Sequence, residues 1–142
     1  MSTTVPGTRN EEAVTRAIRS WNDGDLATYL ELYADDIRNH GLTPEPLDRN
    51  GTQAFYEGLL ASFSHSHIEL HEILSDGDRL TLRFTLTGRH DGDFLGIPAT
   101  GREIALPGIT ILHFRDGRCV ERWTSSDMLG LLVQLGAVPL PG

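Results

Sequence analysis

The stretch that decides the fold runs from Gly101 to Gly136 and reads GREIALPGITILHFRDGRCVERWTSSDMLGLLVQLG. Two runs with period-two alternation flank Asp116-Gly117, and this dipeptide strongly indicates a β-hairpin between apolar runs. An apolar run with helical spacing follows the second strand. The stretch therefore predicts a long strand, a tight turn, a second long strand and a short helix.

Two registers are open for this hairpin, and they place different side chains on one face. A two-residue loop pairs Arg115 with Arg118, whereas a three-residue loop with left-handed Gly117 pairs Phe114 with Arg118. We favour the three-residue loop, because it gathers aliphatic residues, a tryptophan and titratable groups on a surface suited to a small-molecule pocket. That surface comprises Ile109, Ile111, His113, Cys119, Glu121, Trp123, Ser125 and Asp127.

The composition is that of a soluble globular protein. The 142 residues suffice for one domain with its own core, so we expect a single domain over 1–142, with 1–7 as a flexible tail. The net charge of −8 and the lack of a basic stripe argue against nucleic acid or a membrane as partner. The only cysteine is Cys119, which excludes an intrachain disulfide. Without a signal peptide or a long apolar run, we expect a cytoplasmic location.

The remaining chain reads as helices first and strands second. Helical spacing follows Thr8, Asp25 and Asn50, three residues that can each cap a helix. A short strand is expected over 37–41. A strand is expected over 68–74, a turn at Asp76-Gly77, and a strictly alternating strand from Leu80, before a Gly/Pro-rich loop over 91–100. This order predicts an α+β fold whose helices cover one face of an antiparallel sheet.

Four further pieces of sequence carry a family resemblance. They are GRHDGDFLGIPATGR at 88–102, FRDGR at 114–118, VERW at 120–123, and Asp127 with LGLLVQLG at 129–136. Together they resemble the SnoaL-like polyketide cyclases of the nuclear transport factor 2-like superfamily. Ala99 stands where that family usually has a second proline.

The resemblance implies a cone-shaped fold, in which a curved antiparallel sheet wraps a pocket that the N-terminal helices close. It also implies a homodimer or homotetramer and a small hydrophobic substrate. Characterised cyclases of this kind close a ring of an aromatic polyketide by intramolecular aldol condensation, without metal or cofactor. An Asp acts there as general acid and base, assisted by a His, and the best-matching positions here are Asp127 and His113.

Asp127 is the main catalytic candidate. Near Trp123 and aliphatic residues its carboxylate would be desolvated, which would make it a stronger base toward a proton next to a carbonyl. The alternative is that Asp127 only caps the helix that follows it. His113 could stabilise an oxyanion, but in the favoured register it lies about 26 Å from Asp127 along a straight strand.

The remaining candidates would line the pocket and bind substrate. They are His90, His40, Trp123, Ile111 and Ser125. Each also has a structural interpretation, as a core or rim residue satisfied by hydrogen bonds. The spacing of His65, His67 and His71 straddles a helix-to-strand break and is atypical of a metal site, so we expect no metal. No nucleotide-binding or serine-hydrolase motif is present, and we expect no cofactor.

These features predict a cofactor-independent acid/base enzyme acting on a hydrophobic carbonyl compound, with a polyketide cyclase as the first hypothesis. A hydrolase or hydroxylase of the same fold is the alternative; an epoxide-hydrolase-like reaction would need a second carboxylate, and only Glu121 is in phase with Asp127. A third hypothesis is a non-catalytic small-molecule-binding domain, which predicts that Asp127 is an exposed helix cap.

Overall fold

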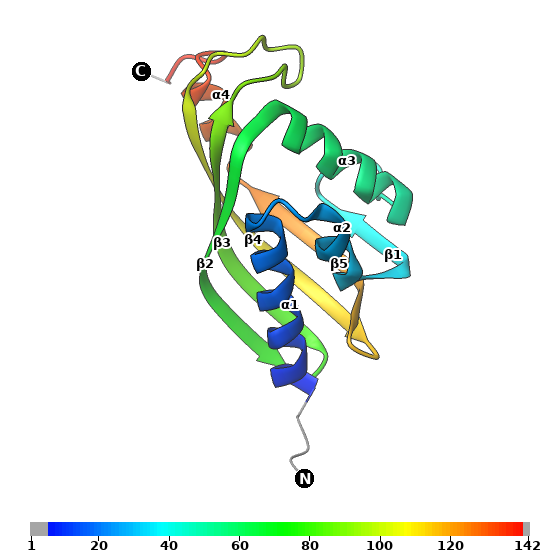
Figure 1. The fold of residues 1–142 in the computed structure, drawn as a ribbon. Coiled ribbons are helices and arrows are strands. Elements are labelled where there is room, and N and C mark those ends of the chain that lie inside the picture. The colour runs from blue at the N-terminus through cyan, green and yellow to red at the C-terminus, as the bar shows by residue number, and fades with distance from the viewer. Residues whose placement is uncertain (1–5, 141–142) are drawn as a thin grey trace.

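The computed structural model describes residues 6–140 (Figure 1). The helices in this range are α1 (Pro6–Asn22), α2 (Leu26–Tyr29), the 3-10 turn η1 (Leu30–Leu32), α3 (Arg49–Ser62) and α4 (Met128–Gln134). The strands are β1 (Tyr33–His40), β2 (Phe63–Asp76), β3 (Arg79–His90), β4 (Glu103–Arg115) and β5 (Arg118–Ser126). This arrangement confirms the expected α+β fold class.

One curved sheet carries the whole architecture. Its strand order is β1-β5-β4-β3-β2, and β2 to β5 pair antiparallel in sequence order, as expected. The edge strand β1 instead pairs parallel to β5, so the sheet is mixed rather than purely antiparallel. The sheet does not close into a barrel; it bends around α1, while α3 lies across the β1 end (Figure 1).

The helix boundaries follow local capping. Helix α1 begins at Pro6, where the missing N–H of proline is tolerated, so it starts before the expected Thr8. Most of the expected tail lies outside the described residues. Asp25 caps α2 as predicted, but that helix is short and the chain turns into β1 at Tyr33. Helix α3 is capped by Asp48, whose carboxylate accepts from the Gly51 N–H at 2.7 Å, rather than by Asn50.

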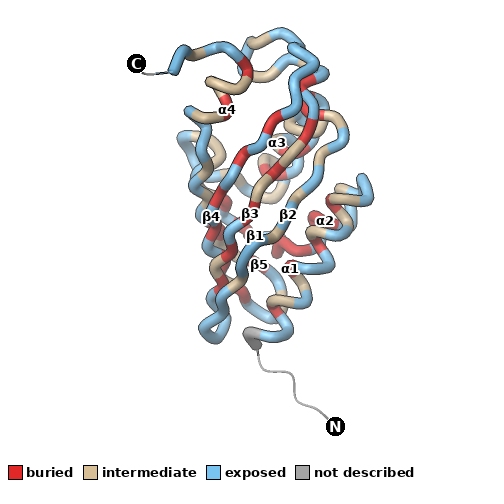
Figure 2. Tube along the Cα trace, turned by 90° about the vertical axis from the view of Figure 1, so that its left-hand side faces the viewer, coloured by how far each residue is buried: buried red, intermediate tan, exposed pale blue. Residues whose placement is uncertain are grey.

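Alternating burial defines an inner and an outer face of the sheet. Along β3 and β4 every second residue is buried, and the red and blue segments of Figure 2 show this alternation. The inner face carries Leu82, Phe84 and Leu112, which pack against the helices. The outer face carries exposed residues such as Ile109 and Ile111. None of the helices formed by residues 6–140 is long and apolar enough to cross a membrane.

The β4–β5 hairpin has the two-residue loop, so the register that we favoured is wrong at the turn. Arg115 pairs with Arg118, and both Asp116 (φ 53°) and Gly117 (φ 81°) are left-handed, as a primed turn requires. A bulge after Phe114 then inserts one extra residue into β5. Cys119 consequently faces the core, contrary to expectation.

Candidate functional site

An apolar cavity of about 90 Å³ lies between α3 and the inner face of the sheet. Its walls come from all four helices, from β2 to β5 and from the loops after β1 and β3. The lining residues are Trp21, Tyr29, Gly41, Leu42, Phe55, Tyr56, Leu59, Ile68, Phe84, Leu86, Phe94, Leu106, Arg122, Thr124, Ser126 and Met128. Among the described residues, Arg122 is the only charged group in this lining. An apolar cavity with few polar groups is the usual form of a small-molecule site.

Arg122 is held rigidly at one side of this cavity. Its side chain extends from the inner face of β5, and the residue is only 8% exposed. The Nε atom donates to Thr110 Oγ1 at 2.8 Å and lies 3.3 Å from Thr124 Oγ1. The Nη1 atom donates to the hydroxyls of Tyr29, at 3.1 Å, and Tyr33. Within residues 6–140 the Nη2 atom has no hydrogen-bond partner, so it is the donor left for a ligand.

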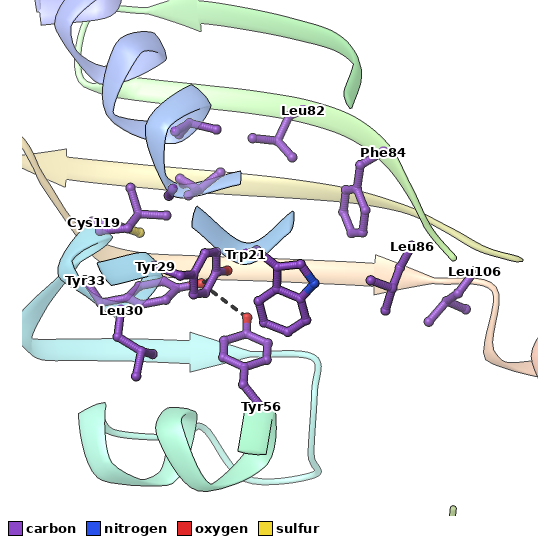
Figure 3. Packing of buried hydrophobic residues seen from close by; sticks show 14 of the residues in the cluster. Trp21, Tyr29, Leu30, Tyr33, Tyr56, Leu82, Phe84, Leu86, Leu106 and Cys119 are labelled. Carbon is purple, nitrogen blue, oxygen red and sulfur yellow. Dashed lines mark hydrogen bonds between the residues drawn. The ribbon is translucent and has the colours of Figure 1, made fainter. Parts of the chain in front are cut away.

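The side chains of Tyr29, Tyr33 and Tyr56 converge (Figure 3), and the first two accept hydrogen bonds from Arg122. The Tyr29 and Tyr33 hydroxyls lie 2.8 Å apart, and those of Tyr33 and Tyr56 lie 3.2 Å apart. Burial raises the pKa of Tyr29 and of Tyr33 well above that of a free tyrosine, so both are neutral at ordinary pH. Tyr56 comes from α3 and lines the cavity, which places it where its hydroxyl can reach a bound molecule.

The predicted site residues of β4 and β5 lie on the outer face, away from this cavity. Strand alternation explains the error: Thr124 and Ser126 line the cavity, so Trp123 and Ser125 point the other way. Trp123 is 37% exposed and Ile111, its partner across the strands, is 42% exposed. This cavity is therefore lined by none of the predicted residues Trp123, Ile111, Ser125 and His113, and Ser125 instead borders a hollow of the outer face.

Two predicted histidines do meet on this outer face. His40 stacks on Trp123, with 5.3 Å between ring centroids and 8° between planes, and His113 lies edge-on to Trp123 at 4.8 Å. The Glu121 carboxylate accepts a hydrogen bond from His40 Nε2 at 2.7 Å. Because Glu121 is engaged here, the second carboxylate of an epoxide-hydrolase-like site is not at the cavity. His40 is likewise not among the cavity-lining residues.

Asp127 is an exposed helix cap. Its carboxylate accepts from the Gly130 N–H at 2.9 Å at the start of α4, and it borders a shallow hollow of the outer face with His71 and Arg83. The expectation of a desolvated carboxylate in an apolar pocket is therefore wrong. Asp127 and His113 also do not form a pair, since His113 is opposite Glu121, six residues or about 20 Å from Asp127 along β5.

His90 is fully buried and holds the loop over 91–102. Its Nδ1 accepts from the Thr100 N–H at 3.2 Å, and its backbone pairs with Arg102 and Gly101. The same loop carries Phe94 into the cavity wall. His90 therefore supports the cavity wall from behind. Our prediction that it lines the pocket is wrong.

No group of three His, Cys, Asp or Glu side chains comes together to hold a metal ion within the part of the chain that is described. The irregular part of β2 contains His65, His67 and His71. His65 has a left-handed backbone there (φ 53°).

Sequence reasoning missed Arg122. We gave Tyr29 and Tyr33 only a core role and did not consider an arginine between Glu121 and Trp123. The alternation of side chains along the strand could have identified it. Once the hairpin has its bulge, Arg122 lies on the same face of the sheet as Thr110 and the apolar inner residues. A cation on an apolar strand face is unusual and would have indicated a buried functional group.

Comparison with known proteins agrees with the fold. A model of the SnoaL-like polyketide cyclase family matches residues 11–135. The chain is 30% identical over 132 residues to the aklanonic acid methyl ester cyclase DnrD of Streptomyces peucetius, covering 88% of this chain and 89% of that protein. It is 28% identical over 129 residues to the aklanonic acid methyl ester cyclase DauD of Streptomyces sp. strain C5, covering 88% and 80%. The crystal structure of AclR, a candidate hydroxylase from Streptomyces galilaeus, superimposes with a TM-score of 0.85 at 29% identity, covering 92% and 97%.

Proposed function

Because the chain belongs to the SnoaL-like polyketide cyclase family, we propose that it closes a ring of a polyketide by cofactor-independent intramolecular aldol condensation. The relatives DnrD and DauD are named as aklanonic acid methyl ester cyclases, and this compound is the first substrate to test. The proposal rests on one observation: Arg122 lines the apolar cavity, and its Nη2 atom has no hydrogen-bond partner among the described residues.

The cavity supports this reaction in two ways. Its apolar walls can enclose the reacting part of a polyketide, folded so that the two reacting carbons approach each other, which removes much of the entropic barrier. The Arg122 guanidinium can donate to a carbonyl oxygen and stabilise the negative charge that gathers there as an enolate forms. Both effects are stronger in a site from which water is excluded.

The chemical step needs no redox change. A proton leaves the carbon between two carbonyls, the resulting enolate carbon bonds to a ketone carbon, and the ketone oxygen takes up a proton. The hydroxyl of Tyr56 lies in the cavity wall and is linked to Arg122 through Tyr33, so it is the group best placed to protonate the new alkoxide.

Asp127 has a smaller place in this mechanism than the family resemblance implied. The lining formed by the described residues contains no carboxylate and no imidazole. We therefore assign the rate enhancement to substrate positioning and oxyanion stabilisation by Arg122, with Asp127 as the alternative base. The proton between two carbonyls is acidic enough that a strong side-chain base is dispensable.

The test is turnover of aklanonic acid methyl ester by Arg122→Gln. Loss of one oxyanion donor commonly lowers kcat by about 100- to 1,000-fold, and we expect a loss of that size. Arg118→Gln is the matched control, because Arg118 lies on the same strand but is exposed. A folded Arg122→Gln enzyme with undiminished kcat would refute the mechanism. Ligand binding without turnover in the unmodified chain would favour the non-catalytic binding domain, for which an exposed Asp127 cap was predicted.

A hydroxylase is the second candidate. One observation favours it: the similarity to AclR, a candidate hydroxylase. Mass spectrometry of the same reaction separates the two candidates. An aldol ring closure leaves the mass unchanged, or lowers it by one water, whereas hydroxylation adds one oxygen atom.

A further inference from the structure

Arg122 carries a positive charge that has no counter-ion among residues 6–140. Its four hydrogen-bonding partners are the hydroxyl groups of Thr110, Thr124, Tyr29 and Tyr33. The ion pairs found in the described part of the chain involve other residues. Removing a cation from water costs several kcal/mol, and folded proteins normally offset that cost with an anion.

The tyrosines do not provide the missing negative charge. Burial raises the pKa of both Tyr29 and Tyr33, so neither is a phenolate at neutral pH. Burial by itself lowers the pKa of Arg122, but the surrounding phenol groups more than reverse this, and its pKa lies well above the ordinary value. The guanidinium is therefore charged at neutral pH.

The unbalanced charge belongs to a residue that lines the cavity. Nε and Nη1 are occupied by hydroxyl oxygens, and Nη2 is the remaining donor on a residue that lines the cavity. Phe84, Leu86 and Leu106 of the neighbouring strands add apolar wall that offers no competing polar group. A ligand would therefore meet apolar surface on most sides and a cation at one point.

We propose that the cavity selects ligands as anions, namely an aromatic or polycyclic body with one ionised oxygen, an enolate or a carboxylate, that pairs with Arg122. The enolate form deepens the proposed function, on which this part rests. The substrate would lose its proton to water before or during entry, and Arg122 would stabilise the ionised form. That order of events explains how a cavity lined without a carboxylate or imidazole in the described residues can promote an aldol reaction.

Non-reacting probes test the two kinds of anion, an enolate and a carboxylate. Benzoylacetone is a 1,3-diketone whose enolate has its own ultraviolet absorption, and 2-naphthoate is a carboxylate with 2-naphthamide as its neutral counterpart. With the unmodified chain we expect at least a tenfold larger ionisation constant for bound than for free benzoylacetone. We also expect 2-naphthoate to bind about 10- to 100-fold more tightly than 2-naphthamide, the usual range for a charged hydrogen bond.

The variants assign the effect to the guanidinium. Arg122→Gln should abolish both preferences, Arg122→Lys should retain part of them, and the exposed control Arg118→Gln should leave them unchanged. Folding is checked by circular dichroism. If Arg122→Gln does not fold, the comparison of charged with neutral probes on the unmodified chain still shows whether the cavity prefers anions.

The proposal is overturned if the unmodified chain prefers neither anion, or if folded Arg122→Gln keeps the preference. Because these probes do not react, the result is independent of ring closure. An anion preference without turnover of aklanonic acid methyl ester would leave this inference standing and refute the aldol reaction. Turnover of aklanonic acid methyl ester without any anion preference would refute this inference and leave the aldol reaction standing.

Discussion

Substitution of Asp127 separates a helix cap from a catalytic base. The carboxylate accepts one hydrogen bond, from the Gly130 N–H at 2.9 Å, and the residue is exposed on the outer face. Asp127→Ala removes this cap and should lower the free energy of unfolding by about 1 kcal/mol, the typical contribution of an N-cap. For a chain of this length that corresponds to a fall in Tm of about 3 °C.

Asp127→Asn should behave differently, because asparagine caps helices about as well as aspartate. It retains a carbonyl oxygen for the Gly130 N–H but cannot accept a proton at neutral pH. We expect its Tm to equal that of the unmodified protein. Its kcat should stay within about threefold, since the structure places Asp127 outside the cavity-lining set.

The assay combines thermal unfolding by circular dichroism with chromatographic measurement of ring closure in aklanonic acid methyl ester. Asp48→Ala and Asp48→Asn are the matched controls, because Asp48 caps α3 in the same way, accepting from the Gly51 N–H at 2.7 Å. General acid–base catalysis contributes about 100- to 10,000-fold. An Asp127→Asn protein with an unchanged Tm and a kcat reduced by that factor would refute the reasoning.

Three further predictions concern the cavity mouth, the core and the outer face. A Cβ on Gly41, which has φ 92°, would lie 2.1 Å from the Thr124 carbonyl oxygen, so Gly41→Ala should cost about 2–4 kcal/mol in urea unfolding. Gly24 has φ 78°, but a Cβ added there would meet no atom within 4 Å, so Gly24→Ala should lower the free energy of unfolding by less than Gly41→Ala. Cys119 is 0% exposed and burial raises its pKa to about 12, so a thiol reagent at pH 8 should modify it only after unfolding. The expected homodimer or homotetramer would use the outer face, so Ile111→Glu should lower the mass measured by light scattering; an unchanged mass would exclude this face.

The sequence predicted the fold class and most elements, because periodicity and capping are local properties. The alternation in β3, the Asp25 cap and the turn at Asp116-Gly117 are all visible in neighbouring residues. The parallel pairing of β1 with β5 was not predictable in this way. It joins residues such as Asn39 and Arg122, which are more than eighty positions apart, and depends on where α2 ends.

The candidate site was harder to predict than the fold, because a sheet has two faces. Our reasoning collected a plausible set of residues on one face of β4 and β5, and His113, Trp123 and Ser125 do share a face. Nothing local says which face the helices cover. The helices cover the opposite face of the sheet. The candidate site residues are therefore Arg122 and the tyrosines rather than Asp127 and His113.

The contacts that fix Arg122 also decide what it can do. Its Nε and Nη1 atoms are held by groups from three elements, namely Thr110 on β4, Tyr29 on α2 and Tyr33 on β1. Because these partners are neutral, they orient the guanidinium without cancelling its charge. Because they occupy its other donors, only Nη2 can turn toward a ligand. A cation oriented in this way needs little rearrangement when negative charge develops in front of it, and that property makes a buried donor effective in catalysis.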